Sequence, residues 1–293
     1  MPDDHPFHGG LQADLHTLAA RHQARRRAFL VAGSLGLLGG GTSLALSACG
    51  GGGDAGGGTS TASGSSSTAT ATATDGSTCS VVPTETEGPY PGDGSNTASG
   101  GIANALMLSG IVRSDIRSSV DTASGTAAGV PMTLKVKLVN VNDACAPLEG
   151  WALYVWHCTA GGLYSMYSSS VVDENFLRGV QATDADGVAT FITIVPGCYS
   201  GRMPHIHFEV YRSLNTATSA DNQLKTSQMA LPTSVCQAVY ADTSTYANSA
   251  SNLARLSFAT DNIFADGYGS QLLTMTGNVT DGYEATLSVG LSV

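Results

Sequence analysis

The chain has 293 residues, of which 13 are Lys or Arg and 23 are Asp or Glu, so its formal net charge is −10 at pH 7. Only 12% of the residues are charged, about half the share of roughly 25% in ordinary globular proteins. With so few basic residues to neutralise phosphates, we expect no nucleic-acid partner. Hydrophobic residues make up 42% of the chain, which is enough for a folded core and excludes disorder along its whole length.

Residues 1–48 are typical of an export signal. Arginines at 25–27 precede an apolar segment, 28–48, that contains no charged residue. The letters RRAFL at 26–30 resemble a twin-arginine signal, a route for proteins that fold before export. A membrane-spanning anchor is the alternative, but the five glycines within 33–41 favour a signal.

The apolar segment ends in Leu-Ser-Ala-Cys at 46–49, which resembles the lipobox of bacterial lipoproteins. This resemblance implies that Cys49 carries lipid and anchors an exported protein, periplasmic or at the cell surface, to a bacterial membrane. From residue 50 to residue 78 the chain is Gly, Ala, Ser and Thr apart from two aspartates, a composition that cannot form a core. We therefore expect a lipidated, flexible tether over 49–78 and one folded domain over 79–293.

The rest of the chain is typical of β-structure. Apolar and polar residues alternate over 132–141, which predicts a half-buried strand. A second strand is expected over 151–157, and the turn residues between the two segments predict a hairpin. The apolar run 188–195 predicts a strand buried on both faces, and 205–211 a further strand. This spacing predicts an all-β chain with a single β-sandwich or barrel domain.

Two histidines on one predicted strand indicate a metal site. Alternation places His205 and His207 on the same face. Positions two apart on a strand are about 6.6 Å from each other, which lets two imidazoles bind one ion. The alternative is that both histidines lie on a solvent-exposed face and bind no metal. Because His157 is the only other histidine after residue 48, a zinc enzyme with three histidine ligands is a second hypothesis.

Tyrosines close to these histidines favour iron over zinc. Tyr199 lies just before the strand, and Tyr164 lies on a glycine-bearing loop after the segment 151–157. A phenolate is a hard, anionic oxygen ligand and suits a ferric ion. Tyr167, three residues further on, competes with Tyr164 for this role.

Three segments in a fixed order resemble the intradiol ring-cleavage dioxygenases, the family of the catechol and protocatechuate 3,4-dioxygenases and their secreted relatives. They are TEGPYPG at 86–92, YVWHCTAGGLYS at 154–165 and TDADGVATFITIVPGCYSGRMPHIHFEV at 183–210. The resemblance extends over most of residues 79–235. It implies a β-sandwich enzyme that cleaves a catecholic ring with dioxygen, between the two hydroxylated carbons, to a cis,cis-muconate type diacid.

The resemblance also implies a set of site residues. Tyr164, Tyr199, His205 and His207 match the four protein ligands of a non-haem Fe(III). Tyr199 is expected to leave the metal when substrate binds and to take up a substrate proton. Arg202 matches an arginine that stabilises negative charge on the substrate ring.

Several further positions follow from the resemblance less directly. Gln228 matches a glutamine that assists the same charge. Gly88, Pro89 and Tyr90 are candidates for one wall of the substrate slot, although a plain turn is an equal alternative there. His157 stands where the family often has Gln or His, so we expect it in the core or behind the ligands.

The chain also departs from its family. Only five residues separate Tyr199 from His205, fewer than in the catechol and protocatechuate enzymes, which predicts an open pocket for bulkier or lignin-derived catechols. A signal and tether replace the helical dimerisation region, so the oligomeric state stays open.

A free thiol beside Fe(III) is hazardous, so we expect Cys198 to be bridged, with Cys236 as a candidate partner. The remaining alternative is a non-catalytic surface lipoprotein that binds aromatics or glycans.

Overall fold

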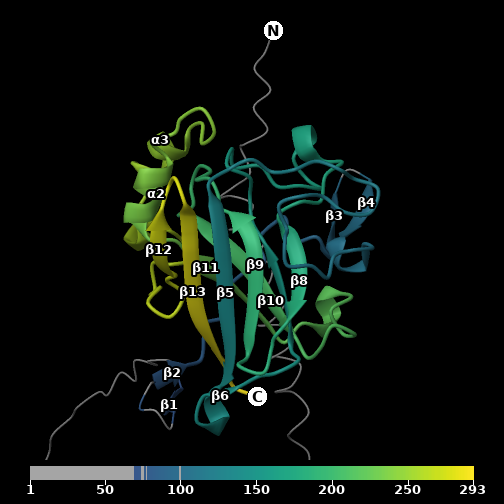
Figure 1. Cartoon of the computed structure of the whole chain (residues 1–293), viewed down its shortest axis with the longest axis vertical. Coiled ribbons are helices and arrows are strands. Elements are labelled where there is room, and N and C mark those ends of the chain that lie inside the picture. Colours follow the sequence, from purple (N-terminus) through teal and green to yellow (C-terminus); the bar gives the residue numbers. More distant parts are fainter. Residues whose placement is uncertain (1–68, 74–75, 77, 99) are drawn as a thin grey trace, which may run out of the picture. The chain divides into compact units, whose positions relative to one another are not determined.

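The computed structural model describes residues 69–293 except 74, 75, 77 and 99. The predicted signal, Cys49 and most of the predicted tether lie outside these residues. Most elements are strands (Figure 1): β1 (Thr70–Thr72), β2 (Thr78–Ser80), β3 (Asp93–Ala98), β4 (Gly101–Asn104), β5 (Pro131–Asn140), β6 (Ala146–Pro147), β7 (Ala152–Trp156), β8 (Arg178–Ala182), β9 (Val188–Ile194), β10 (His205–Tyr211), β11 (Lys225–Ala230), β12 (Thr274–Asn278) and β13 (Gly282–Leu291). The helices described are α2 (Thr233–Val239) and α3 (Ser249–Leu253), with the short 3-10 helices η1 (Ala105–Met107), η2 (Val141–Asp143), η3 (Ser169–Val171), η4 (Ala220–Asn222) and η5 (Phe258–Thr260).

Two larger sheets build the domain, and two small hairpins, β1-β2 and β3-β4, accompany them. One sheet has the order β12-β13-β5-β6, with β9 also paired to β5. The other has the order β11-β10-β7-β8. The strands β13 and β5 run parallel, whereas β10 is antiparallel to both β7 and β11. The predicted all-β sandwich is confirmed.

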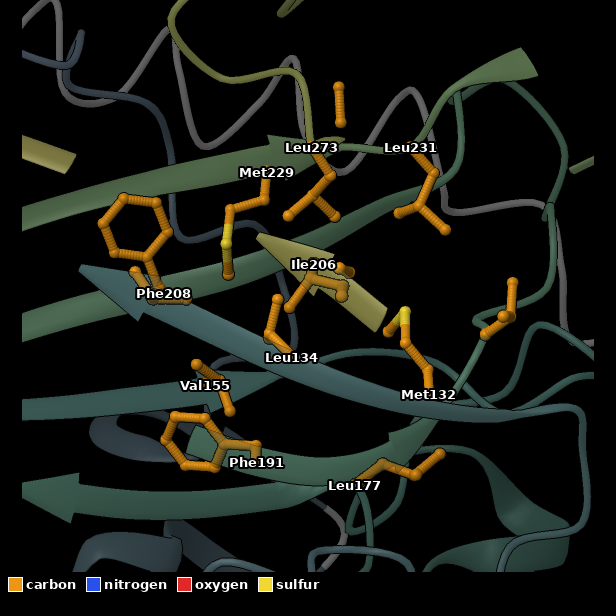
Figure 2. Packing of buried hydrophobic residues seen from close by; sticks show 14 of the residues in the cluster. Met132, Leu134, Val155, Leu177, Phe191, Ile206, Phe208, Met229, Leu231 and Leu273 are labelled. Atoms are coloured by element: carbon orange, nitrogen blue, oxygen red, sulfur yellow. The ribbon is translucent and has the colours of Figure 1, made fainter. Parts of the chain in front are cut away.

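The main hydrophobic core lies between the two sheets. Figure 2 shows apolar side chains from both layers meeting there, among them Leu134 of β5, Phe191 of β9 and Phe208 of β10. All three are fully buried. Because alternate residues of a strand point to opposite faces, the apolar positions of β10 fill this core and its polar positions turn to the other side.

The strand predictions have mixed outcomes. The predicted strands 132–141 and 205–211 are confirmed as β5 and β10. The predicted hairpin is wrong, because β5 and the strand at 151–157, β7, belong to different sheets. Every residue of β7 is buried, since this strand is central in its sheet. The strand at 188–195, β9, has exposed and part-buried residues on one face, so it is not buried on both.

Cysteine pairing also differs from expectation. The structure has one disulfide among the described cysteines, between Cys79 and Cys145. Cys158, Cys198 and Cys236 are free and buried, so the expected bridge to Cys198 is wrong. The Cys198 thiol instead lies 3.6 Å from the carbonyl oxygen of Arg202, and burial protects it from solvent oxidants.

The pairing of β1 with β2 begins inside the segment predicted as a tether. It lies next to the disulfide, because Cys79 is in β2. Among the described residues, strand pairing therefore begins at Thr70, before the predicted domain boundary. Within the part of the chain that the structure describes, no helix has the length and apolar character needed to cross a membrane.

Candidate metal centre and active site

The strand β10 holds both histidines of the candidate metal centre in the middle of a sheet. His207 lies opposite Trp156 of β7 and opposite Gln228 of β11. All seven residues of β10 are buried. Main-chain hydrogen bonds on both sides fix the direction of each side chain, so His205 and His207 share one face as predicted.

The four predicted ligands come together on this face. The Nε2 atoms of His205 and His207 are 3.0 Å apart, and the Tyr199 hydroxyl oxygen lies 3.2 Å from His205 Nε2. The ring of Tyr164 lies edge-on to those of Tyr199 and His207, with centroids 6.0 Å and 6.3 Å away. Two imidazole nitrogens and two phenol groups thus surround one buried point.

Surrounding groups orient the two imidazoles. His205 Nδ1 donates to the carbonyl oxygen of Met203 at 2.6 Å, which leaves the lone pair of Nε2 directed at the cluster. The ring of His207 stacks on Trp156 with centroids 4.9 Å apart and planes 7° apart. Burial, then the nearby charge of Arg202, lowers the pKa of His205 to about 3. Burial and His205 lower the pKa of His207 well below its usual value, so both rings are neutral at pH 7.

This donor set fits a ferric ion. Neutral imidazoles with an inward lone pair are metal ligands, and phenolate oxygens add the negative charge that a trivalent cation favours. His207 Nδ1 is buried and makes no hydrogen bond to any described residue, so the stacking on Trp156 is the contact that orients this ring. Tyr164, Tyr199, His205 and His207 could therefore hold Fe(III) together.

The alternative ligands do not join the cluster. His157 uses both ring nitrogens elsewhere, Nε2 at 2.7 Å from Thr193 Oγ1 and Nδ1 at 2.8 Å from the carbonyl oxygen of Cys158. It occupies a core position, and a three-histidine zinc site would require it to abandon one of these bonds. The Tyr167 hydroxyl accepts from the Gly92 N–H and donates to an Asn96 oxygen, so it too is occupied outside the cluster.

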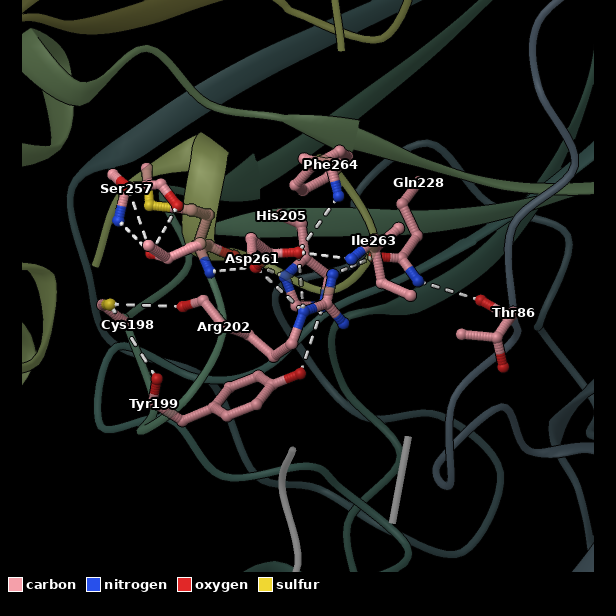
Figure 3. Close-up of polar contacts among 12 residues, drawn as sticks. Thr86, Cys198, Tyr199, Arg202, His205, Gln228, Ser257, Asp261, Ile263 and Phe264 are labelled. Atoms are coloured by element: carbon pink, nitrogen blue, oxygen red, sulfur yellow. Dashed lines mark hydrogen bonds and ion pairs between the residues drawn. The ribbon is translucent and has the colours of Figure 1, made fainter. Parts of the chain in front are cut away.

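Arg202 lies behind the histidines in a buried polar network (Figure 3). Its Nε is 3.0 Å from Asp261 Oδ2, and its Nη2 donates to Gln228 Oε1 at 2.6 Å. Gln228 in turn donates to the carbonyl oxygen of Thr86 at 2.9 Å. Arg202, Gln228 and Asp261 are all fully buried. The two residues predicted to act on the same substrate charge are therefore in direct contact.

The predicted slot residues lie on the chain segment that follows Thr86. The ring of Tyr90 packs against Tyr164, with centroids 4.9 Å apart. Gly88 donates its N–H to Thr86 Oγ1, and the carbonyl oxygen of Pro89 accepts from Asn96. Tyr90 is thus beside a candidate ligand, whereas the described contacts of Gly88 and Pro89 are those of a turn.

Sequence reasoning missed two groups of acidic residues near the cluster. Asp261 is the carboxylate partner of Arg202 and lies far along the chain, without a motif of its own. Glu209 continues the histidine face of β10 and groups with Glu87 and Asp93, whose carboxyl oxygens lie within 4.8 Å of one another. Burial and the neighbouring Asp93 raise the pKa of Glu209 to about 8. Period-two alternation could have placed Glu209 on this face.

Comparisons with known proteins find similar proteins among the dioxygenases. Residues 112–216 match a family model described as dioxygenase. The chain is similar to an intradiol ring-cleavage dioxygenase from Tetranychus urticae at 25% identity and a TM-score of 0.55, covering 73% of this chain and 95% of that one. A second dioxygenase structure has 25% identity, a TM-score of 0.54 and the same coverage, 73% and 95%. No curated protein matches the chain significantly.

The family match, the sandwich and its buried cluster define an enzyme class, the dioxygenases. Within that class, the chain resembles the intradiol ring-cleavage dioxygenases, through the family match over residues 112–216 and through the similar solved structures. This resemblance supports cleavage of a catechol-type ring.

Proposed function

We propose that the protein is a non-haem Fe(III) dioxygenase that cleaves a catecholic ring between its two hydroxylated carbons and forms a cis,cis-muconate type diacid. Tyr164, Tyr199, His205 and His207 are the proposed ligands. The observation that carries the proposal is the closeness of three candidate ligand atoms. The Nε2 atoms of His205 and His207 lie 3.0 Å apart, and the Tyr199 hydroxyl oxygen lies 3.2 Å from His205 Nε2. When bound, a ferric ion draws electron density from a chelated catecholate and allows the ring to react with dioxygen.

Proton transfer is assigned to Tyr199. A catechol must lose its hydroxyl protons before it can bind as a dianion, and a phenolate oxygen is a suitable acceptor for one of them. Tyr199 lies on the loop before β10 and is part-buried, whereas Tyr164 is 2% exposed. The more accessible tyrosine is the better candidate for a ligand that detaches and takes up the proton.

Charge stabilisation is assigned to Arg202, with Gln228 as its neighbour. Negative charge develops on the ring as it is attacked, and a guanidinium in a dry site stabilises that charge more strongly than one in water. Arg202 is fully buried and is held by hydrogen bonds rather than by solvent. Tyr90 is proposed to form part of the ring-binding wall, together with Gly88 and Pro89.

Catechol, hydroxyquinol and bulkier substituted catechols are the proposed substrates, because the segment between Tyr199 and His205 is short. We further propose that the enzyme acts outside the cytoplasm as a lipoprotein anchored through Cys49. The support for this location is the sequence of residues 1–49 alone.

Metal analysis and a visible spectrum of the purified protein test the proposal. A tyrosinate bound to Fe(III) gives a visible charge-transfer band, whereas zinc gives none. We expect one iron per chain and a coloured protein, and we expect the Tyr199→Phe variant to keep its iron with a shifted, weaker band. A colourless protein after iron loading, or a spectrum that Tyr199→Phe leaves unchanged, would contradict the assignment.

A further inference from the structure

Asp261 forms an ion pair with Arg202 in the interior of the protein. Arg202 Nε lies 3.3 Å from Asp261 Oδ1 and 3.0 Å from Oδ2, and neither side chain is exposed to solvent. Figure 3 shows Asp261, Arg202 and His205 within the same group of polar contacts. Asp261 follows η5, well beyond the residues that match the family model.

Backbone groups fix the Asp261 carboxylate in place. Its Oδ1 accepts from the N–H groups of Ile263 at 2.9 Å and Phe264 at 3.2 Å. Its Oδ2 accepts from the N–H of Met203 at 2.7 Å. A carboxylate held by three main-chain donors cannot rotate, so it also fixes the guanidinium that pairs with it.

The opposite edge of the Arg202 guanidinium is fixed as well. Nη2 donates to Gln228 Oε1, and the ring of Phe264 lies 5.8 Å from the guanidinium carbon. Arginine is planar, and hydrogen bonds at two of its edges determine the plane of the whole group. Asp261 therefore sets the orientation of Arg202 while supplying the negative charge that a buried cation requires.

The same carboxylate reaches a proposed metal ligand through one residue. The N–H of Met203 donates to Asp261, and its carbonyl oxygen accepts from His205 Nδ1 at 2.6 Å. Such outer contacts determine the direction in which a histidine ligand points. Asp261 thus holds both a substrate-charge residue and, through Met203, an imidazole of the metal centre.

We propose that Asp261 is a positioning residue for ring cleavage, which orients Arg202 toward the substrate ring and steadies Met203 behind His205. This inference rests on the proposed function, and it assigns to the region after β11 a part in the active site. Both Asp261 oxygens accept hydrogen bonds. In either orientation, an asparagine at this position would place its amide N–H group against the N–H donor of Arg202, Met203 or Ile263, so one hydrogen bond would be lost.

A double-mutant cycle with Arg202→Ala tests the inference in the full chain. We expect Asp261→Asn to lower kcat/KM for catechol by about 10- to 100-fold, the usual cost of losing an outer contact, mainly through kcat and at unchanged iron content. In the Arg202→Ala background the same change should cost less than about twofold, because effects of coupled residues do not add. Asp115→Asn is the matched control, because it breaks an exposed Asp–Arg pair with Arg117, and it should leave kcat/KM unchanged.

Wild-type kcat/KM in Asp261→Asn, or an effect of the same size in both backgrounds, would overturn the inference. A crystal structure of the wild-type enzyme soaked with catechol gives a readout that needs neither turnover nor a folded variant. It should show Arg202 directed at the catechol while its Nε stays on Asp261. An Arg202 that turns away from Asp261 on binding would refute the inference, whereas a wild type that binds catechol in this way without cleaving any catechol would refute only the proposed function.

Discussion

Replacing His157 by glutamine should change how stability depends on pH. Burial lowers the pKa of His157 from 6.5 to about 4, because the charged ring would lie 2% exposed between Thr193 and Cys158. Below pH 6.5 His157 becomes protonated in the unfolded chain, whereas in the folded chain it becomes protonated only near pH 4. His157 therefore stabilises the fold above pH 6.5, and this contribution is lost as the pH falls toward 4. The loss amounts to about 3 kcal/mol.

Urea unfolding of wild type and His157→Gln at pH 7, 6, 5 and 4 measures this loss directly. Glutamine can occupy a similar volume but does not titrate. Acid titration of all other groups is common to both proteins, so it cancels in the difference between their free energies of unfolding. That difference should shift by about 3 kcal/mol in favour of the variant between pH 7 and pH 4. A difference independent of pH would refute the buried, neutral histidine, and loss of metal from the variant would revive the zinc hypothesis.

Three further predictions concern the core, the cysteines and proton transfer by Tyr199. Phe208→Ala should lower the free energy of unfolding by about 3–5 kcal/mol, because it leaves a cavity between the sheets, and a loss below about 1 kcal/mol in urea unfolding would contradict the packing. Mass spectrometry of protein unfolded with alkylating agent and no reductant should find Cys198 alkylated and the Cys79 and Cys145 peptides linked; a Cys198 disulfide would contradict the structure. Tyr199→Phe should lower kcat for catechol by about 100-fold, the contribution of a general base, while an unchanged kcat would remove Tyr199 from proton transfer.

The shared face of the two histidines could be predicted from the sequence because it depends only on local geometry, whereas Tyr164 and Tyr199 were assigned from the family resemblance. His205 and His207 share a face through the period of a single strand, and that holds wherever the strand lies in the sheet. The turn-rich spacing of strands likewise sufficed for the all-β class. Glu209 follows the same period, but its buried partner Asp93 could not be paired with it from the sequence.

What failed depended on contacts between distant segments. The segment 151–157 pairs with β8 and β10, not with β5, and local alternation carries no information on partner strands. Asp261 is 59 residues from Arg202, and an aspartate without a motif does not indicate a partner. The expected Cys198 bridge rested on the reactivity of a free thiol, but Cys198 is buried, and burial limits that reactivity without a disulfide.

Oxygen consumption by the purified, iron-loaded protein with catechol is the sharpest test of ring cleavage by this protein. We expect one dioxygen to be consumed per catechol without an added reductant, and cis,cis-muconate to accumulate in equal amount. We also expect His207→Ala, which removes a proposed iron ligand, to abolish both signals. Iron-loaded wild-type protein that consumes no oxygen with catechol, hydroxyquinol or any substituted catechol would contradict the proposed dioxygenase function.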